Sequence, residues 1–320
     1  MKLISTQQVR KGAAPRQLLL EKTVTRYLRQ QSTLSFAEIE ESKSPISKME
    51  SLSAFPPAKF PKKNIFLGLI NAPEMMLGHN VMICSQPLSD ELGDFIARNS
   101  RTKETSGSWM KNILSNFQKV IVLDQSDFPS SASFMPWVPV VLASRIPVVL
   151  EKKSKGNAKV RVLLIQHGKA PRIGISKKLH EELGPLCEVI ELSEKEPFGP
   201  ALEEMLNADI HIHLGYSAFE KPNIFSPFDS MINGAYTVIL ADHPDSEAQI
   251  ENRLRQEANI RTYVQIVTTE TETVNASQEM LRRLLIIQQS KLSLNPELMK
   301  FAPLNEKYIT ERYTSFMERI

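Results

Sequence analysis

The loop at residues 166–174 combines residue types that can bind a phosphate or a diphosphate. Two glycines, Gly168 and Gly174, allow a ligand to approach the backbone closely, and Lys169 and Arg172 supply two positive charges. The loop leads into a stretch with helical spacing, whose N-terminus would add about half a positive charge. The alternative is an ordinary loop whose basic residues are simply solvated.

A second candidate loop, at residues 217–234, leads into a short predicted helix, a glycine and an apolar run. In this loop the backbone N–H groups of Phe225 and Ser226 would point at an anion, and Asp229 could accept hydrogen bonds from a ribose diol. An acid near a helix start is also favourable as a cap, without any ligand.

Histidines are the other candidates for chemistry. His79 lies near a strand end and could face a cleft as a general base, a role that suits imidazole near neutral pH. His211 and His213 alternate on one strand and so share a face, but no Cys, Asp or Glu at ligand spacing completes a metal site. We expect these two to be core or strand-end histidines, and we predict no metal and no cofactor.

Short apolar runs alternate with helical stretches from residue 64 onward. The predicted strands are 65–70, 80–84, 119–124, a run ending near 142 or 150, 160–167, 187–192, 208–216, 235–242 and 263–269. Helices are expected at about 88–98, 107–117, 175–184, 199–206, 226–233, 245–258 and 275–291. Runs that are apolar throughout are typical of parallel strands covered on both faces, so the alternation predicts doubly wound α/β domains.

Composition shifts divide the chain. Residues 1–63 are read as a basic helical extension and connector, and 64–150 as a first Rossmann-like domain. The lysine-rich stretch 151–159 is the predicted linker, 160–295 the second Rossmann-like domain, and 296–320 a C-terminal helix.

Length, charge and cysteine content limit the partners and the cellular location that we expect for the protein. The chain has 320 residues and a net charge of +3, and residues 1–63 carry twelve Lys or Arg against five Asp or Glu. This basic arm either contacts an anionic membrane surface or is simply solvated, and no nucleic-acid-binding pattern occurs. Two cysteines in apolar runs, no long apolar span and no signal-peptide core predict a cytoplasmic protein, peripheral at the membrane if the arm binds lipid.

The second half resembles the donor-binding domain of GT-B glycosyltransferases, in particular the family-four type. The resemblance rests on the acidic strand start at 208–210, the loop containing Asp229, the small-residue and Gly234 pattern, and the strand and Asp turn at 235–242. Arg172 and Lys169 resemble the family's basic residues, with Gly174 in the place of its glycine.

The sequence also departs from the family pattern. Lys221 stands where the first acid of the acidic loop belongs, and Glu220 lies one residue further from Asp229. Ile173 replaces the lysine that precedes the family's glycine.

The resemblance implies two Rossmann-like domains and transfer of a sugar from a nucleotide diphosphate-sugar donor. The acceptor would be a glycan, a lipid-linked acceptor or a protein. Arg172, Lys169 and a helix N-terminus would stabilise the diphosphate without a metal, Asp229 would hold the ribose and Glu220 would contact sugar hydroxyls. Two alternatives stay open: a non-catalytic relative that binds or scaffolds, and a sugar-nucleotide epimerase.

Overall fold

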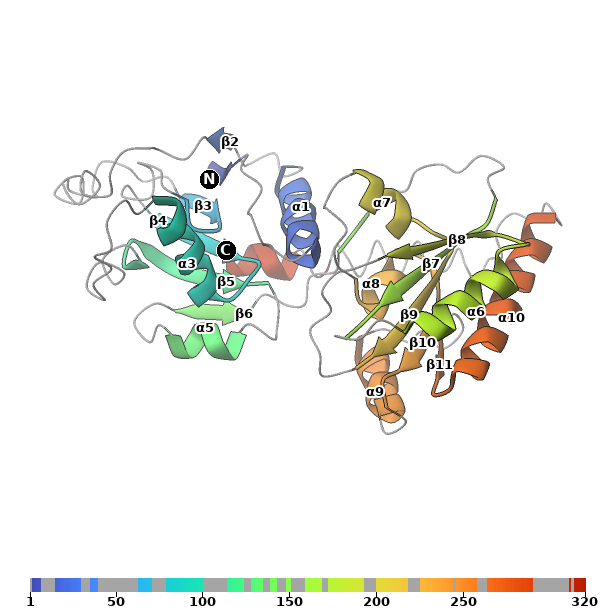
Figure 1. Cartoon of the computed structure of the whole chain (residues 1–320). Helices are drawn as coiled ribbons and strands as arrows, with labels where there is room; N and C mark the ends of the chain where they lie inside the picture. Colours follow the sequence, from blue (N-terminus) through green and yellow to red (C-terminus); the bar gives the residue numbers. More distant parts are fainter. Residues whose placement is uncertain are drawn as a thin grey trace. The chain divides into compact units, whose positions relative to one another are not determined.

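Two parallel β-sheets organise the chain, one in each of two units (Figure 1). The first unit comprises Met1–Ala13, Gln17–Ile146 and Thr310–Ile320, and the second comprises Ala14–Arg16 and Pro147–Ile309. The computed structural model describes residues 2–6, 15–29, 35–39, 63–70, 79–99, 114–123, 128–134, 139–142, 148–150, 159–168, 172–192, 200–217, 225–243, 246–257, 264–289, 311 and 314–320.

The first unit contains a six-stranded sheet in the order β2-β1-β3-β4-β5-β6. Its strands are β1 (Lys2–Thr6), β2 (Ser35–Ile39), β3 (Lys63–Leu67), β4 (His79–Cys84), β5 (Phe117–Val122) and β6 (Val140–Leu142). Its helices are α1 (Pro15–Arg29), whose first two residues belong to the second unit, α3 (Leu88–Asn99) and α5 (Phe128–Phe134). The core beside β3 and β5 includes an edge-to-face pair, Phe66 and Phe117, with ring centroids 5.5 Å apart.

The end of the chain also belongs to the first unit. Residues 314–319 are helical, and the side chain of Phe316 is fully buried. The Lys119 ammonium on β5 donates to the carbonyl of Arg319, whose guanidinium donates to the carbonyl of Leu142 on β6. These contacts tie the terminal helix to two strands of the sheet.

The structure corrects the predicted basic extension at residues 1–63. β1 pairs in parallel with both β2 and β3, so this region supplies strands of the first sheet. In α1 the side chains of Leu20, Val24 and Leu28 are at most 1% exposed. Contact of this region with a membrane stays a prediction. The boundary between the units, at 146–147, also precedes the predicted linker.

The second unit contains a five-stranded sheet in the order β11-β10-β9-β7-β8. Its strands are β7 (Arg161–Gln166), β8 (Glu188–Leu192), β9 (Ile210–Tyr216), β10 (Tyr236–Ala241) and β11 (Val264–Val267). Its helices are α6 (Ile173–Leu183), α7 (Pro200–Leu206), α8 (Pro227–Ile232), α9 (Glu247–Glu257) and α10 (Glu270–Gln289). The predicted fold class of two Rossmann-like domains is therefore confirmed.

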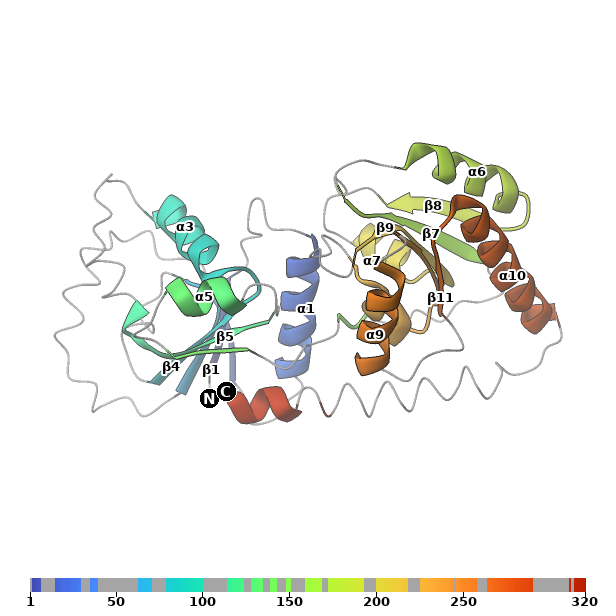
Figure 2. The same cartoon turned by 90° about the horizontal axis from the view of Figure 1, so that it is seen from below.

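Both faces of the second sheet are covered, which explains why its strands β7, β9 and β10 are almost wholly buried. Ile212 and Leu214 of β9 pack in a core that includes residues of α6 and α10, which lie side by side on this face (Figure 2). Residues of α8 and α9 pack with Ile239 of β10 in a second cluster. Since side chains alternate along a strand, His211 and His213 face away from the side that Ile212 occupies.

The N-terminus of α10 lies five residues before the predicted start of its helix. Glu272 accepts hydrogen bonds from the backbone N–H groups of Thr268 and Thr269, at 3.2 and 3.1 Å, and the Thr269 hydroxyl accepts from the N–H of Glu272. This reciprocal capping box starts the helix at Glu270, ahead of its apolar positions. Within the described residues, no helix is both long and apolar enough to cross a membrane.

Candidate functional site

The strand order of the second unit reverses beside β7. From β7 the chain passes through α6 to β8 on one side, and then through α7 to β9 on the other side. Open α/β sheets bind ligands at such a switch point, outside the carboxyl ends of the strands. Two glycines lie there with left-handed backbone, Gly168 with φ 78° and Gly215 with φ 74°. The carboxyl edge of β7 and β9 is therefore the candidate site.

Arg172 lies at this carboxyl edge. Its Nη2 donates to Oδ1 of Asp242, the residue after β10, at 2.9 Å, and its side chain is 30% exposed. A Cβ at Gly215 would lie 2.7 Å from Nε of Arg172, so glycine permits this close approach. A guanidinium has five N–H donors, so the pairing with Asp242 leaves donors for an anion.

Gln166 fixes the position of Arg172. Its side-chain oxygen accepts the backbone N–H of Arg172 at 3.1 Å, and its side-chain nitrogen donates to Glu191 of β8 at 2.9 Å. Glu191 also accepts from the hydroxyl of Ser176 on α6 at 2.5 Å. These bonds hold the first turn of α6 against the ends of β7 and β8, with Arg172 as the N-cap residue.

The other residues predicted for the phosphate loop are not all at this edge. Gly174 is exposed on the first turn of α6, and a Cβ there would meet nothing within 4 Å. Its position therefore allows other residue types, although it leaves the helix N-terminus open to a ligand. Lys169 and Glu220 lie outside the described residues.

Asp229 forms a buried cap, which corrects the predicted ribose contact. Its carboxylate accepts hydrogen bonds from the backbone N–H of Ser226 at 2.9 Å, from the Ser226 hydroxyl at 2.6 Å and from the N–H of Val148 at 3.1 Å. It also pairs with Arg16, and its side chain is 0% exposed. The Ser226 hydroxyl caps α8 in return, and Phe225 is fully buried. The hydrogen bonds and the ion pair of these groups are made within the protein. We therefore do not retain Phe225, Ser226 or Asp229 as ligand contacts.

The role of His79 as a base stays a prediction. His79 is the first residue of β4, so it lies at the amino end of this strand, opposite the edge at which open α/β sheets bind ligands. Its Nδ1 is hydrogen-bonded to the side-chain amide of Gln118.

A buried polar cluster that the sequence analysis did not assemble lies under the carboxyl edge. Nε2 of His167 is hydrogen-bonded to Nδ1 of His213 at 2.8 Å, and Nε2 of His213 to the Ser230 hydroxyl at 2.8 Å. Nδ1 of His211 is hydrogen-bonded to the same hydroxyl at 2.8 Å. The rings of His167 and His213 stack with centroids 5.1 Å apart, and Tyr216 meets His167 edge to face.

Burial keeps the imidazoles of His167 and His213 neutral. Desolvation lowers the pKa of His167 to about 3. It also lowers the pKa of His213 well below its ordinary value, and the neighbouring His167 and His211 lower it further. The described residues contain no group of three or more His, Cys, Asp or Glu suited to a metal ion.

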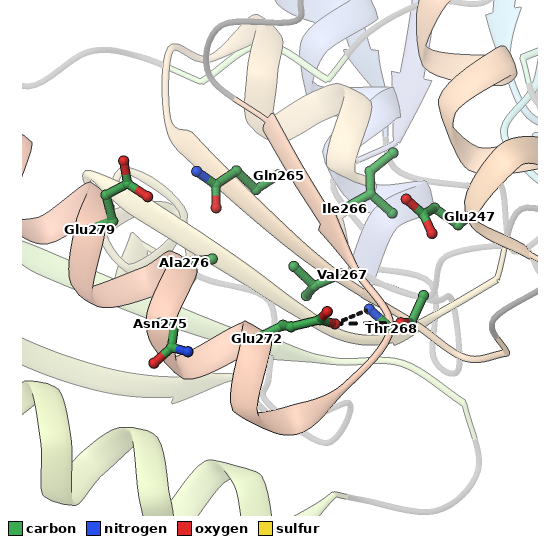
Figure 3. A pocket seen from close by; sticks show the side chains of 9 residues that line it. All are labelled: Glu247, Gln265, Ile266, Val267, Thr268, Glu272, Asn275, Ala276 and Glu279. Atoms are coloured by element: carbon green, nitrogen blue, oxygen red, sulfur yellow. Dashed lines mark hydrogen bonds between the residues drawn. The ribbon is translucent and has the colours of Figure 1, made fainter.

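A separate hollow of about 300 Å³ lies beside β11, where residues of α9 and α10 line it (Figure 3). Three carboxylates line it, those of Glu247, Glu272 and Glu279. Because they would repel a diphosphate, this hollow does not compete with the carboxyl edge as an anion site.

No protein-family model and no curated protein matches the sequence. Among solved structures, the chain is similar to the glycotransferase of kitacinnamycin, with 11% identity, 99% of this chain and 98% of that chain covered, and a TM-score of 0.39. It is also similar to the spinosyn forosaminyltransferase SpnP, with 12% identity, 98% and 95% coverage, and a TM-score of 0.38. For CalG4, the calicheamicin glycosyltransferase, the values are 8% identity, 97% and 94% coverage, and a TM-score of 0.37. Likeness at this level is too slight to decide function, which we argue from the geometry of the site.

Proposed function

We propose that the second unit binds a nucleotide diphosphate-sugar at the carboxyl edge of β7 and β9, and that the protein is a glycosyltransferase. The observation that carries this proposal is the guanidinium of Arg172, which lies against Gly215 at the switch point and begins α6. A guanidinium and a helix N-terminus together favour an anion with several oxygens, such as a diphosphate. The sequence resemblance to donor-binding domains supports the same class of ligand.

The chemistry would depend on charge that develops on the leaving group. As the bond between the sugar and the diphosphate breaks, negative charge gathers on the diphosphate, and Arg172 with the first turn of α6 would stabilise it. Lys169 and Glu220 remain proposed contacts to phosphate and sugar. The acceptor would be a glycan, a lipid-linked acceptor or a protein. Since the protein's own cations would supply the charge stabilisation, we expect transfer to continue in the presence of EDTA.

Titration calorimetry with uridine, guanosine, thymidine and adenosine diphosphates tests the binding site. Replacing Arg172 with alanine should weaken binding of the preferred nucleotide by about 1.5–3 kcal/mol, because a charge-assisted hydrogen bond is lost. Arg161→Ala is the matched control, since Arg161 also pairs with a carboxylate, Glu188, and its side chain is 29% exposed. Arg161 begins β7, at the opposite end of the strand. Equal affinities of wild type and R172A would remove Arg172 from the site.

A non-catalytic relative that keeps the binding site is the second candidate. It is favoured by the buried cap at Asp229, which leaves no ligand role for the residue that resembles the family's second acid. Donor turnover with analysis of the sugar product separates the candidates. Turnover to a transferred or hydrolysed sugar supports a transferase, and binding without turnover supports the non-catalytic relative. Formation of the epimeric sugar would point instead to an epimerase.

A further inference from the structure

The buried cluster under the carboxyl edge forms one continuous chain of hydrogen bonds. It runs from His167 to His213, then to the hydroxyl of Ser230 and on to His211, with each of these links 2.8 Å long. The two strands β7 and β9 and the helix α8 supply its members. His213, Ser230 and His211 are 0% exposed, and His167 is 8% exposed.

Neutral imidazole restricts how this chain can be protonated. Each neutral ring has one N–H donor and one bare nitrogen acceptor, and a hydroxyl donates one hydrogen bond while accepting others. All three links can therefore be made in three ways, because the hydroxyl can also accept from His213 and His211 at once. Either all three histidines carry their proton on Nδ1, or His167 and His213 carry it on Nε2 and His211 carries it on either nitrogen. A proton on Nδ1 of His167 thus requires Nδ1 protons on His213 and His211 as well.

His167 presents a different group in each of its two tautomers. With the protons on Nδ1, His167 offers an N–H donor, and with the protons on Nε2 it offers a bare nitrogen. His167 directly follows β7, and its backbone N–H donates to the carbonyl of Leu214 on β9 at 3.0 Å. This places His167 at the switch point, one residue after Gln166, whose side chain holds Arg172.

We propose that His167 donates a hydrogen bond from Nδ1 to the diphosphate of the donor, and that His213, Ser230 and His211 are positioning residues that fix this tautomer. The identity of the anion rests on the proposed function. An anion accepts hydrogen bonds and so selects the state with protons on Nδ1. Low pKa values for His167 and His213 agree with a neutral donor. The neutral His167 thus adds a directional hydrogen bond to the fixed positive charge of Arg172.

Other roles for the cluster fit the structure less well. Ser230 is fully buried, so it is not placed to attack a substrate as a nucleophile. Both ring nitrogens of His213 are used within the chain, so this residue has no lone pair directed at a metal.

Nitrogen NMR of the full chain tests the proposal, because chemical shifts distinguish a protonated from a bare imidazole nitrogen. The chain has six histidines, and His79, His180 and His243 are exposed, so they serve as internal controls. Spectra are recorded with and without inorganic pyrophosphate and with the preferred nucleoside diphosphate. We expect His167, His213 and His211 all to carry their proton on Nδ1 when the ligand is bound.

Three outcomes separate the inference from the proposed function. Binding with all three protons on Nδ1 supports both. Binding with His167 protonated on Nε2, or with mixed tautomers among the three, overturns the inference and leaves the binding site intact. Absence of binding for every phosphate ligand overturns both.

Two variants test the hydrogen-bonded chain through ligand affinity and through the tautomers of its histidines. His167→Gln should weaken pyrophosphate binding about tenfold, since it removes the donor from the edge. Ser230→Ala interrupts the chain between His213 and His211, so the tautomer of His211 should no longer follow ligand binding while His167 and His213 still do. If His211 still changes with ligand in S230A, the hydroxyl is not a link in the chain.

Discussion

Two arginine–aspartate pairs in the second unit make the same chemical contact in opposite environments. The pair of Arg16 with Asp229 is buried, with side chains 5% and 0% exposed. The pair of Arg172 with Asp242 is open, with side chains 30% and 55% exposed. A buried charge must be satisfied inside the protein, whereas a half-exposed one can exchange its partner for a ligand. Residue type therefore suggests a ligand contact in both regions, and burial assigns one pair to the fold and the other to the site.

Removing Asp229 should have the largest effect on stability. Asp229→Ala deletes the carboxylate that pairs with buried Arg16 and the cap of α8, and we expect a loss of about 3–5 kcal/mol in the free energy of unfolding. Urea denaturation measures it. Asp242→Ala is the matched change in the open pair and should cost about 1 kcal/mol or less. Comparable losses in the two variants would break the contrast between the regions.

Acid should destabilise the region around α8 through its neutral histidines. The unfolded chain binds a proton at each imidazole below about pH 6.5, while His167 stays neutral down to about pH 3. Stability should therefore fall as the pH drops from 6.5 toward 3, by about 2 kcal/mol at pH 5 for His167 alone.

Urea denaturation at pH 7.5 and pH 5 measures this difference. His167→Gln should remove about 2 kcal/mol of the loss, and His180→Gln, at an exposed position on α6, should leave it unchanged. A wild-type pH dependence in H167Q would show that His167 already binds a proton in the native protein.

The smallest predicted effect concerns the open pair of Arg172 and Asp242, and it tests whether Asp242 competes with the ligand. Asp242→Asn removes a negative charge beside the proposed diphosphate and frees Arg172 from its ion pair. Nucleoside diphosphate affinity should rise about two- to fivefold, with stability changed by less than about 1 kcal/mol. Calorimetry with the nucleotide and urea denaturation measure the two quantities. A weaker affinity would mean that Asp242 positions Arg172 more than it competes with the ligand.

The strands of the second unit could be predicted from the sequence within one or two residues at most ends. The runs of β7 and β10 are mostly apolar because helices cover both faces of the sheet, and this signal is local. In contrast, β1 and β2 are short segments in a basic region, and their place in the sheet depends on parallel pairing between distant residues. The charge of a segment does not show which distant strand it pairs with, so the sequence predicts only an extension for residues 1–63.

The candidate site was predictable in part for the same reason. Arg172 follows a strand that ends at a switch point, and both features can be seen in the order of elements. The shared face of His211 and His213 also follows from their spacing. Their link to His167 required the register of β7 against β9, and the link to Ser230 required the packing of α8. For Asp229 the motif predicts a ligand contact. The sequence does not show that groups of the protein itself already bind the carboxylate.

The discontinuous first unit has a consequence for how the protein matures during synthesis. Thr310–Ile320 joins strands made much earlier, and the whole of Pro147–Ile309 is translated in between. Apart from Ala14–Arg16, the second unit is one uninterrupted stretch, which can complete its sheet on the ribosome while the first still waits for its terminal helix. We expect that, in limited proteolysis of nascent chains, the sheet of the second unit becomes protected before the sheet of the first unit.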